Sequence, residues 1–254
     1  VCKQPELTWS HARAHAASNS RLASDLHRYA APDPSLHFGG GQTLGNSYRI
    51  SGDGGGWGPI TEALNVMAEV VKYTHPGGYP DPDNILGPHG TVGRVTESQA
   101  RVQMVLWSIM PTQLILGEDV TQMSDEYIET VGNEELIAVN QDTPLVGSAK
   151  RIVGGDLKFP CKPSNGSNAV CENIWSRPLA NGDVALAMVN QGANASITCD
   201  QACFAAAGLG GAKKVKVRDM LAHADLAELS PPFALKASVA GEGAVAAFRL
   251  TPVK

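Results

Sequence analysis

An arginine and an aspartate stand four residues apart in the stretch NSYRISGDGGGWG, residues 46–58. The alternating pattern before the glycines predicts an extended strand, on which Arg49 and Asp53 would point to the same side. A carboxylate at the end of such a strand stands where barrel enzymes place catalytic groups, and the arginine could bind substrate hydroxyl groups. The glycines that follow would let the backbone pass close to a ligand. The competing interpretation is an Arg–Asp ion pair beside a flexible turn.

A second group of carboxylates lies in PGGYPDPDNILG, residues 76–87. Asp81 and Asp83 flank Pro82, which stiffens the loop and holds both carboxylates near the start of a short apolar run. These side chains could bind sugar hydroxyl groups or a cation. A solvated turn is the alternative, because Pro, Gly and Asp are common in turns of every kind.

Other residues give weaker evidence of a functional site. His11 and His15 have the spacing of a metal-binding pair, but the segment HARAH lacks a metalloprotease glutamate and a third ligand. No glycine pattern has the strand, the spacing and the lysine of a phosphate loop. Trp107 and Met104, at helical spacing, are expected in the core. We therefore expect no metal site and no cofactor.

The elements that must position these groups change character near residue 150. Before it, the predicted strands SYRISG, DNILG and TQLILG alternate with helical patterns. One helix should begin after Thr96, where Gln99 completes a capping box, and another after Ser124, with Gly132 as its end. This alternation is typical of a parallel sheet. After residue 150, Asn181-Gly182 indicates a hairpin, and the alternating stretches that follow predict an antiparallel sheet.

The composition excludes several classes of protein. The chain has 254 residues, 43% of them hydrophobic, and a formal charge of -5, as expected for a soluble globular protein. It has no basic face for nucleic acid or for an anionic membrane. No apolar run reaches the roughly 20 residues that a transmembrane helix needs.

The cysteines and glycosylation signals indicate an oxidising compartment. Cys161 with Cys171, and Cys199 with Cys203, are close pairs in sequence and natural candidates for disulfides. Two glycosylation acceptors, at Asn165 and Asn194, lie beside those pairs. Together these features predict a secreted, extracellular or lysosomal/vacuolar protein.

The start of the chain, VCKQPELTW, has no initiator methionine and no signal pattern. It is interpreted as a cut inside a longer chain. Cys2 has no local partner, and we expect its partner in sequence upstream.

In order along the chain, seven motifs resemble the successive landmarks of the α-galactosidase and α-N-acetylgalactosaminidase family of retaining glycoside hydrolases. They are YRISGD…W, PGGYPDPDNILG, LWSIMPTQLILGEDV, NEELIAVNQD, IWSRPLANGDVALAMVN, KVRDM and AAFRLTP. The resemblance covers roughly residues 46 to 254. The chain departs from the family pattern at Tyr79, Pro80, Asn84 and in the segment 112–114.

The resemblance implies an α/β fold in which only the back half of a barrel is present. Residues 1–148 would form the C-terminal half of a (β/α)8 TIM barrel, and residues 149–254 an antiparallel β-sandwich domain. Asp53 matches the family's general acid/base, Arg49 an arginine that contacts the sugar, and Asp83 a pocket carboxylate. The nucleophile, carried in this family by a K-Y-D-like strand, has no counterpart in the 254 residues.

The activity implied is the hydrolysis of terminal α-linked galactose, or of a related glycan, by a retaining double displacement. The chain alone would be inactive without the N-terminal half of the barrel, a partner that a disulfide through Cys2 could tie to it. Lys3 and Gln4 fit neither family version of the motif that reads the 2-position of the sugar, so N-acetylgalactosamine stays open as the glycone. Two alternatives stand beside this one: a non-catalytic carbohydrate-binding or cell-wall structural module, and a truncated gene product without a stable fold.

Overall fold

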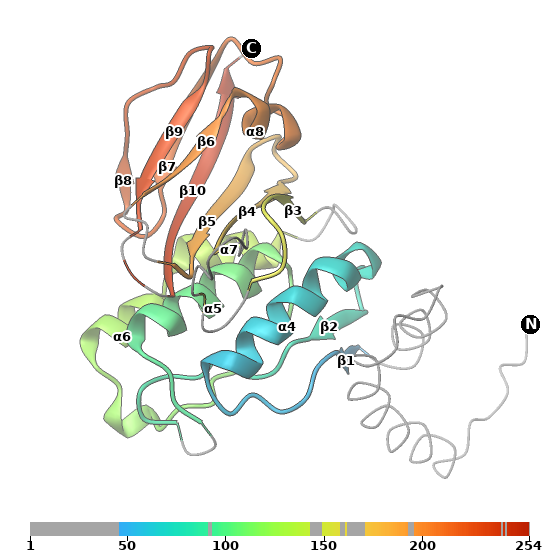
Figure 1. Cartoon of the computed structure of the whole chain (residues 1–254), viewed down its shortest axis with the longest axis vertical. Coiled ribbons are helices and arrows are strands. Elements are labelled where there is room, and N and C mark those ends of the chain that lie inside the picture. Colours follow the sequence, from blue (N-terminus) through green and yellow to red (C-terminus); the bar gives the residue numbers. More distant parts are fainter. Residues whose placement is uncertain are drawn as a thin grey trace, which may run out of the picture.

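The computed structural model describes residues 46–90, 93–142, 149–157, 161, 171–192, 196–239, 241 and 243–253. They form two parts, which we call the helical part (46–142) and the sheet part (149–253). Figure 1 shows the strands of the sheet part stacked on the helices of the helical part. Within the described residues, no helix is both long and apolar enough to cross a membrane.

The helical part contains short strands and four α-helices. Its elements are β1 (Ser47–Arg49), α4 (Trp57–Val70), the 3-10 helix η1 (Val71–Tyr73), β2 (Tyr79–Asp81), α5 (Glu97–Ile109), the 3-10 helix η2 (Val120–Gln122), α6 (Asp125–Val131) and α7 (Glu134–Gln141).

The strands of this part are parallel, as the sequence predicts, but shorter. β1 pairs in parallel with β2, and Ile85 forms a parallel bridge with Leu116. Two backbone hydrogen bonds of 2.8 Å support that bridge. The predicted strands DNILG and TQLILG were therefore wrong in extent, because only one residue of each pairs. The PGGYPD segment, interpreted as a loop, contributes β2.

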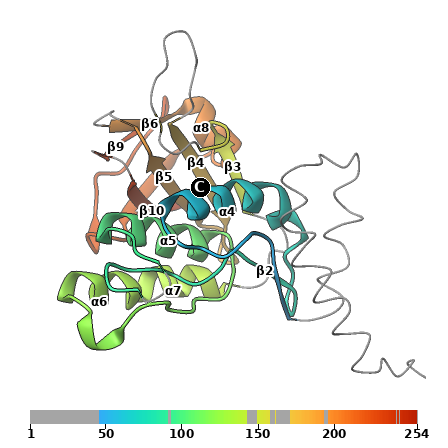
Figure 2. The same ribbon diagram turned by 60° about the horizontal axis from the view of Figure 1, so that its bottom comes forward.

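The helices begin where side chains cap them. Thr96 and Gln99 form the predicted capping box at the start of α5: Thr96 Oγ1 accepts from Gln99 N, and Gln99 Oε1 accepts from Thr96 N. These bonds satisfy two of the amides that a helix N-terminus leaves unpaired. Ser124 caps α6 in the same way, and that helix ends at Gly132 as predicted. Figure 2 shows that α5, α6 and α7 lie close together beneath the sheet part.

The sheet part is antiparallel, as predicted. Its elements are β3 (Lys150–Val153), β4 (Glu172–Pro178), β5 (Val184–Asn190), β6 (Ser196–Asp200), α8 (Gln201–Ala206), β7 (Lys214–Asp219), β8 (Ala224–Asp225), β9 (Ala234–Ser238) and β10 (Ala244–Val253). One sheet has six strands in the order β3-β4-β5-β10-β7-β8, and β6 pairs with β9 in a second sheet. The predicted hairpin joins β4 to β5, with Gly182 at φ 90° in the turn.

The six-stranded sheet is covered on both faces, because successive side chains of a strand point to opposite sides. One face packs on α4, α5 and α7 through Trp175, Ala185, Ala187, Val189 and Ala247. The other packs against β6, β9 and α8 through Ile174, Leu186, Met188, Phe248 and Leu250. All seven residues of β5 are buried for this reason.

Polar contacts join the two parts. The buried guanidinium of Arg177, in β4, donates to the carbonyls of Val139 at 2.7 Å and of Ser108 at 3.2 Å, in the last turns of α7 and α5. Helix C-termini leave such carbonyls unpaired, and a cation there is favoured by the helix dipole. On the periphery, Arg218 binds Glu135 of α7 through two nitrogens, at 2.9 and 3.2 Å.

Candidate active site

Polar residues gather at one end of the parallel strands, among them those predicted to do chemistry. Arg49 ends β1, Asp81 ends β2, and Glu118 follows the bridge at Leu116. Ile50 continues the pairing beyond β1, donating to the carbonyl of Asp81 at 3.0 Å. The carboxyl ends of parallel strands are where barrel folds gather catalytic groups. We call Arg49, Asp53 and Asp83 the candidate site.

Arg49 binds both carboxylates through one nitrogen. Its Nη2 lies 2.9 Å from Asp83 Oδ2 and 3.2 Å from Asp53 Oδ1. The same nitrogen also donates to the carbonyl of Gly52 at 3.0 Å. The structure therefore brings together the three residues that the sequence separated into two motifs. It contains the Arg–Asp ion pair of the competing interpretation as well.

Asp53 does not lie on an extended strand. The strand ends at Arg49, and the chain bends through residues 51 and 52 before Asp53. Its side chain is 97% exposed, against 37% for Arg49 and 19% for Asp83. The two side chains meet through this bend rather than through a strand period of two. The Asp53 carboxylate is therefore open to solvent beside the guanidinium.

Asp83 is held in an unusual backbone conformation. Its φ is 84°, in the left-handed region that side chains other than glycine rarely adopt. Its amide donates to Asp81 Oδ1 at 2.8 Å, and its carbonyl accepts from the indole of Trp107 at 2.9 Å. The sequence placed Trp107 in the core. It is buried there, but it also fixes this carbonyl.

Gly54 supplies a further contact to Asp83. Its amide donates to Asp83 Oδ2 at 2.7 Å. A Cβ added at Gly54 would lie 3.4 Å from that oxygen, in van der Waals contact. The glycine-rich loop thus contacts Asp83 through its backbone.

Asp81 faces a different environment from its neighbour two residues on. Burial raises the pKa of the Asp81 carboxyl above its usual value. The hydrogen bond from the amide of Asp83 and the positive charge of Arg49 oppose that shift. Asp81 supports the loop through the hydrogen bond that its Oδ1 accepts from the amide of Asp83.

Glu118 belongs to the same end of the sheet and was missed in the sequence. Its carboxylate accepts from the amides of His89 and Asp119, both at 3.1 Å. A Cβ at Gly87 would collide with Glu118 Oε2, so only glycine leaves room for this carboxylate. The signal that could have found it is its place directly after the apolar run LILG, at a strand end.

The predicted disulfides are present in the sheet part. Cys161 bonds to Cys171, and Cys199 to Cys203. Cys2, the pair His11 and His15, and the acceptors Asn165 and Asn194 lie outside the described residues. Across the described ranges, no group of three or more His, Cys, Asp or Glu side chains could hold a metal ion.

Comparison with known proteins identifies the family. A family model described as alpha galactosidase A matches residues 54–142, and one described as the alpha galactosidase C-terminal beta sandwich domain matches residues 172–250. Alpha-galactosidase 3 of Arabidopsis thaliana is 31% identical over 215 residues, which is 84% of this chain and 44% of the relative. An alpha-galactosidase of Oryza sativa subsp. japonica is 32% identical over 186 residues, covering 72% of this chain and 40% of that protein.

Solved structures show the same fold. Alpha-galactosidase I from Mortierella vinacea matches with a TM-score of 0.67 at 22% identity, over 94% of this chain and 64% of that one. A GH27 β-L-arabinopyranosidase from Geobacillus stearothermophilus matches with a TM-score of 0.70 at 18% identity, over 94% of this chain and 54% of that one.

The chain belongs to the α-galactosidase family of glycoside hydrolases, GH27, and corresponds to a C-terminal portion of it. Its fold is the C-terminal part of a TIM barrel followed by an antiparallel β-sandwich domain. The chain spans less than half the length of the Arabidopsis and rice relatives.

Proposed function

We propose that this chain is the C-terminal part of a retaining α-galactosidase, with a domain boundary at residues 148 and 149. The observation that carries the proposal is the contact of Arg49 Nη2 with both Asp53 and Asp83 at the carboxyl ends of parallel strands. An ion pair that only stabilises the fold has no need of a second carboxylate whose side chain is 97% exposed. The names of the curated relatives agree with this activity.

In the proposed mechanism Asp53 is the general acid/base. It protonates the glycosidic oxygen as the leaving group departs, while a nucleophilic carboxylate bonds to the anomeric carbon. Asp53 then removes a proton from the water that hydrolyses the glycosyl-enzyme. Arg49 and Asp83 bind hydroxyl groups of the galactose. The chain carries no K-Y-D-like motif, so the nucleophile must come from the N-terminal half of the barrel.

The surface of the helical part supports such a partner. Ile115 and Leu116, next to the last parallel bridge, are 52% and 38% exposed, although they belong to an apolar run. A cavity of about 460 Å³ opens at the starts of the strands, lined by Ser47, Tyr79, Thr112 and Leu114 among others. A complete barrel covers its strand edges and fills this region with side chains. We propose that the missing half packs here, linked through Cys2.

Intact mass measured with and without reductant tests the partner. A larger species that releases a 26.6 kDa chain on reduction is expected. A lone, folded chain of that mass would contradict the partner and favour the second candidate, a non-catalytic carbohydrate-binding or wall module. The observation behind that candidate is the absent nucleophile motif.

Replacement of Asp53 by Asn in the complete assembly tests the catalytic role. We expect turnover of melibiose, whose leaving group is poor, to fall by about 10²- to 10⁴-fold. Turnover of an activated aryl α-galactoside should fall less in its first step, because its leaving group needs little protonation. Asp125→Asn, an exposed change in α6, is the control. Undiminished melibiose hydrolysis in the Asp53 variant would overturn the assignment.

The proposal also covers the compartment in which the protein is located. Two disulfides in the described residues suit an oxidising compartment. We therefore propose a secreted, extracellular or lysosomal/vacuolar protein, glycosylated at Asn165 and Asn194.

A further inference from the structure

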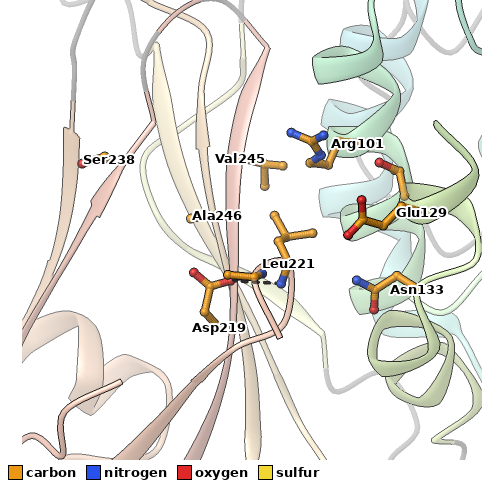
Figure 3. A pocket seen from close by; sticks show the side chains of 10 residues that line it. Arg101, Glu129, Asn133, Asp219, Leu221, Ser238, Val245 and Ala246 are labelled. Carbon is orange, nitrogen blue, oxygen red and sulfur yellow. Dashed lines mark hydrogen bonds between the residues drawn. The ribbon is translucent and has the colours of Figure 1, made fainter. Parts of the chain in front are cut away.

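A second cleft lies between the helical part and the sheet part, and none of its lining residues belongs to the candidate site. Its volume is about 330 Å³, within the range of roughly 300 to 1,000 Å³ that small-molecule sites occupy, and such sites favour the junctions between domains. Figure 3 shows Arg101, Glu129 and Asn133 on the helices, facing Leu221 and Val245 across the cleft.

One carboxylate in the cleft has no partner. Glu129 lies in α6, where its side chain makes no hydrogen bond or ion pair with any residue that the structure describes. Figure 3 shows its carboxylate turned toward Leu221, on the sheet part. Thr130, the next residue, is buried beside it. An acceptor that faces a cleft without a protein donor is available to the hydroxyl groups of a ligand.

Two further side chains of the cleft, Asp219 and Arg101, keep part of their hydrogen-bonding capacity. Asp219 Oδ1 accepts from the amides of Leu221 and Ala222, at 3.0 and 2.9 Å, which fixes the turn after β7. Its Oδ2 makes no hydrogen bond within the described part of the chain. Arg101 binds Glu126 through Nη2 at 2.6 Å, which leaves its other N–H groups as donors at the edge of the cleft.

The sheet part also contributes apolar side chains to the cleft. Val245 and Ala246 of β10 and Leu221 of the turn are each partly exposed there. The buried Asn133 forms part of the base and is already satisfied. Its Nδ2 donates to the carbonyl of Met220 at 2.9 Å, and its Oδ1 caps α7. The cleft thus offers hydrogen-bonding groups from both parts, Glu129 and Arg101 on the helices and Asp219 on the sheet part, beside the apolar side chains of Leu221 and Val245.

We propose that this cleft is a second, non-catalytic binding site for a neutral monosaccharide in the pyranose form. A pyranose presents hydroxyl groups that donate to Glu129 and Asp219 and accept from Arg101, and a C–H face that packs on Leu221 and Val245. An anionic ligand would meet two carboxylates and one guanidinium that is already paired. The proposal depends on the cleft alone and not on the catalytic role of Asp53.

To test the proposed site, the chain is titrated with galactose, glucose and the open-chain polyol galactitol. Binding is measured by isothermal calorimetry and by saturation transfer to the sugar protons. We expect saturable binding of a pyranose and at least tenfold weaker binding of galactitol, which lacks the ring face. Glu129→Ala should weaken pyranose binding about tenfold, the loss of a charged hydrogen bond. The matched control is Glu69→Ala, an exposed change in α4. Thermal unfolding of each variant confirms that it is folded.

Asp83→Asn separates the two sites. If the cleft binds sugar, binding persists in Asp83→Asn and is weakened in Glu129→Ala. Binding that disappears in Asp83→Asn but survives in Glu129→Ala would place the sugar at the candidate site, which overturns the cleft while supporting the proposed function. No saturable binding of any pyranose, or equal affinity in the Glu129 and Glu69 variants, would also overturn it.

Discussion

The indole nitrogen of Trp107 donates a hydrogen bond of 2.9 Å to the backbone carbonyl of Asp83. The donor lies near the end of α5, and the acceptor lies in the loop after β2, at the candidate site. The bond ties a residue of left-handed φ to a helix whose end is itself held by Asn140, which donates to the carbonyls of Trp107 and Thr112. Helix packing thus determines where the Asp83 carboxylate points.

Trp107→Phe should loosen this loop. The change leaves the carbonyl of Asp83 without a partner, at a cost of about 1 to 3 kcal/mol in the free energy of unfolding. Urea unfolding measures that cost. Hydrogen exchange at Gly54, whose amide binds Asp83 Oδ2, should become faster. Trp57→Phe, which removes the indole bond to Gln191 on the sheet part, is the control. Equal exchange at Gly54 in both variants would show that Trp107 does not position Asp83.

Asp83→Gly and Asp83→Ala should differ in stability, with the glycine variant the more stable. Both lose the ion pair with Arg49, but only glycine adopts a φ of 84° without strain. We expect the glycine variant to be the more stable by about 1 kcal/mol, the cost of left-handed backbone for a residue with a Cβ. Chemical denaturation of the two proteins tests this. An alanine variant of equal or higher stability would mean that the loop relaxes away from this φ.

Thr96→Ala should destabilise the chain by about 0.5 to 2 kcal/mol, because it removes the oxygen that accepts from the amide of Gln99. Thr96→Ser keeps that oxygen and should lose little. The difference between the thermal unfolding midpoints of the two variants measures the stabilisation that the cap provides. Similar losses in both variants would indicate that the methyl group, not the cap, matters.

Acid should weaken the contact between the two parts. The hydrogen bond from Arg218, followed by that from His223, lowers the pKa of Glu135 below its usual value. A lowered pKa means that this stabilisation is present above the pKa of the unfolded chain and is lost as the pH falls through the folded value. Glu135→Gln should therefore be less stable at pH 7 and show a flatter loss of stability below about pH 4.5. Parallel pH profiles for the variant and the parent chain would contradict this.

The effect of Asp81 on the pH dependence of stability should have the opposite sign to that of Glu135. Burial raises the pKa of Asp81, so its contribution is complete below the pKa of the unfolded chain and falls as the pH rises through the folded value. Asp81→Asn keeps Oδ1 as acceptor for the amide of Asp83 and removes the buried charge. We expect the stability of this variant to depend less on pH above the ordinary aspartate pKa of about 3.9, which unfolding at several pH values measures. Unchanged pH dependence would show that the carboxyl is not ionising in that range.

The sequence alone determined the local features of this protein. The cap at Thr96, the end of α6 at Gly132, the hairpin at residues 181 and 182 and the nearby cysteine pairs follow from contacts a few residues apart. Motifs in order along the chain also indicated the family and the roles proposed for Arg49, Asp53 and Asp83.

Only the tertiary structure decided how distant groups meet. The sequence could not show that one nitrogen of Arg49 binds both Asp53 and Asp83, since that needs β1 and β2 side by side and a bend after β1. The second role of Trp107, the carboxylate of Glu118 and the cleft beside Glu129 depend in the same way on packing between elements. Side-chain periodicity predicts which face of an element is buried, but not which residue of another element lies against it.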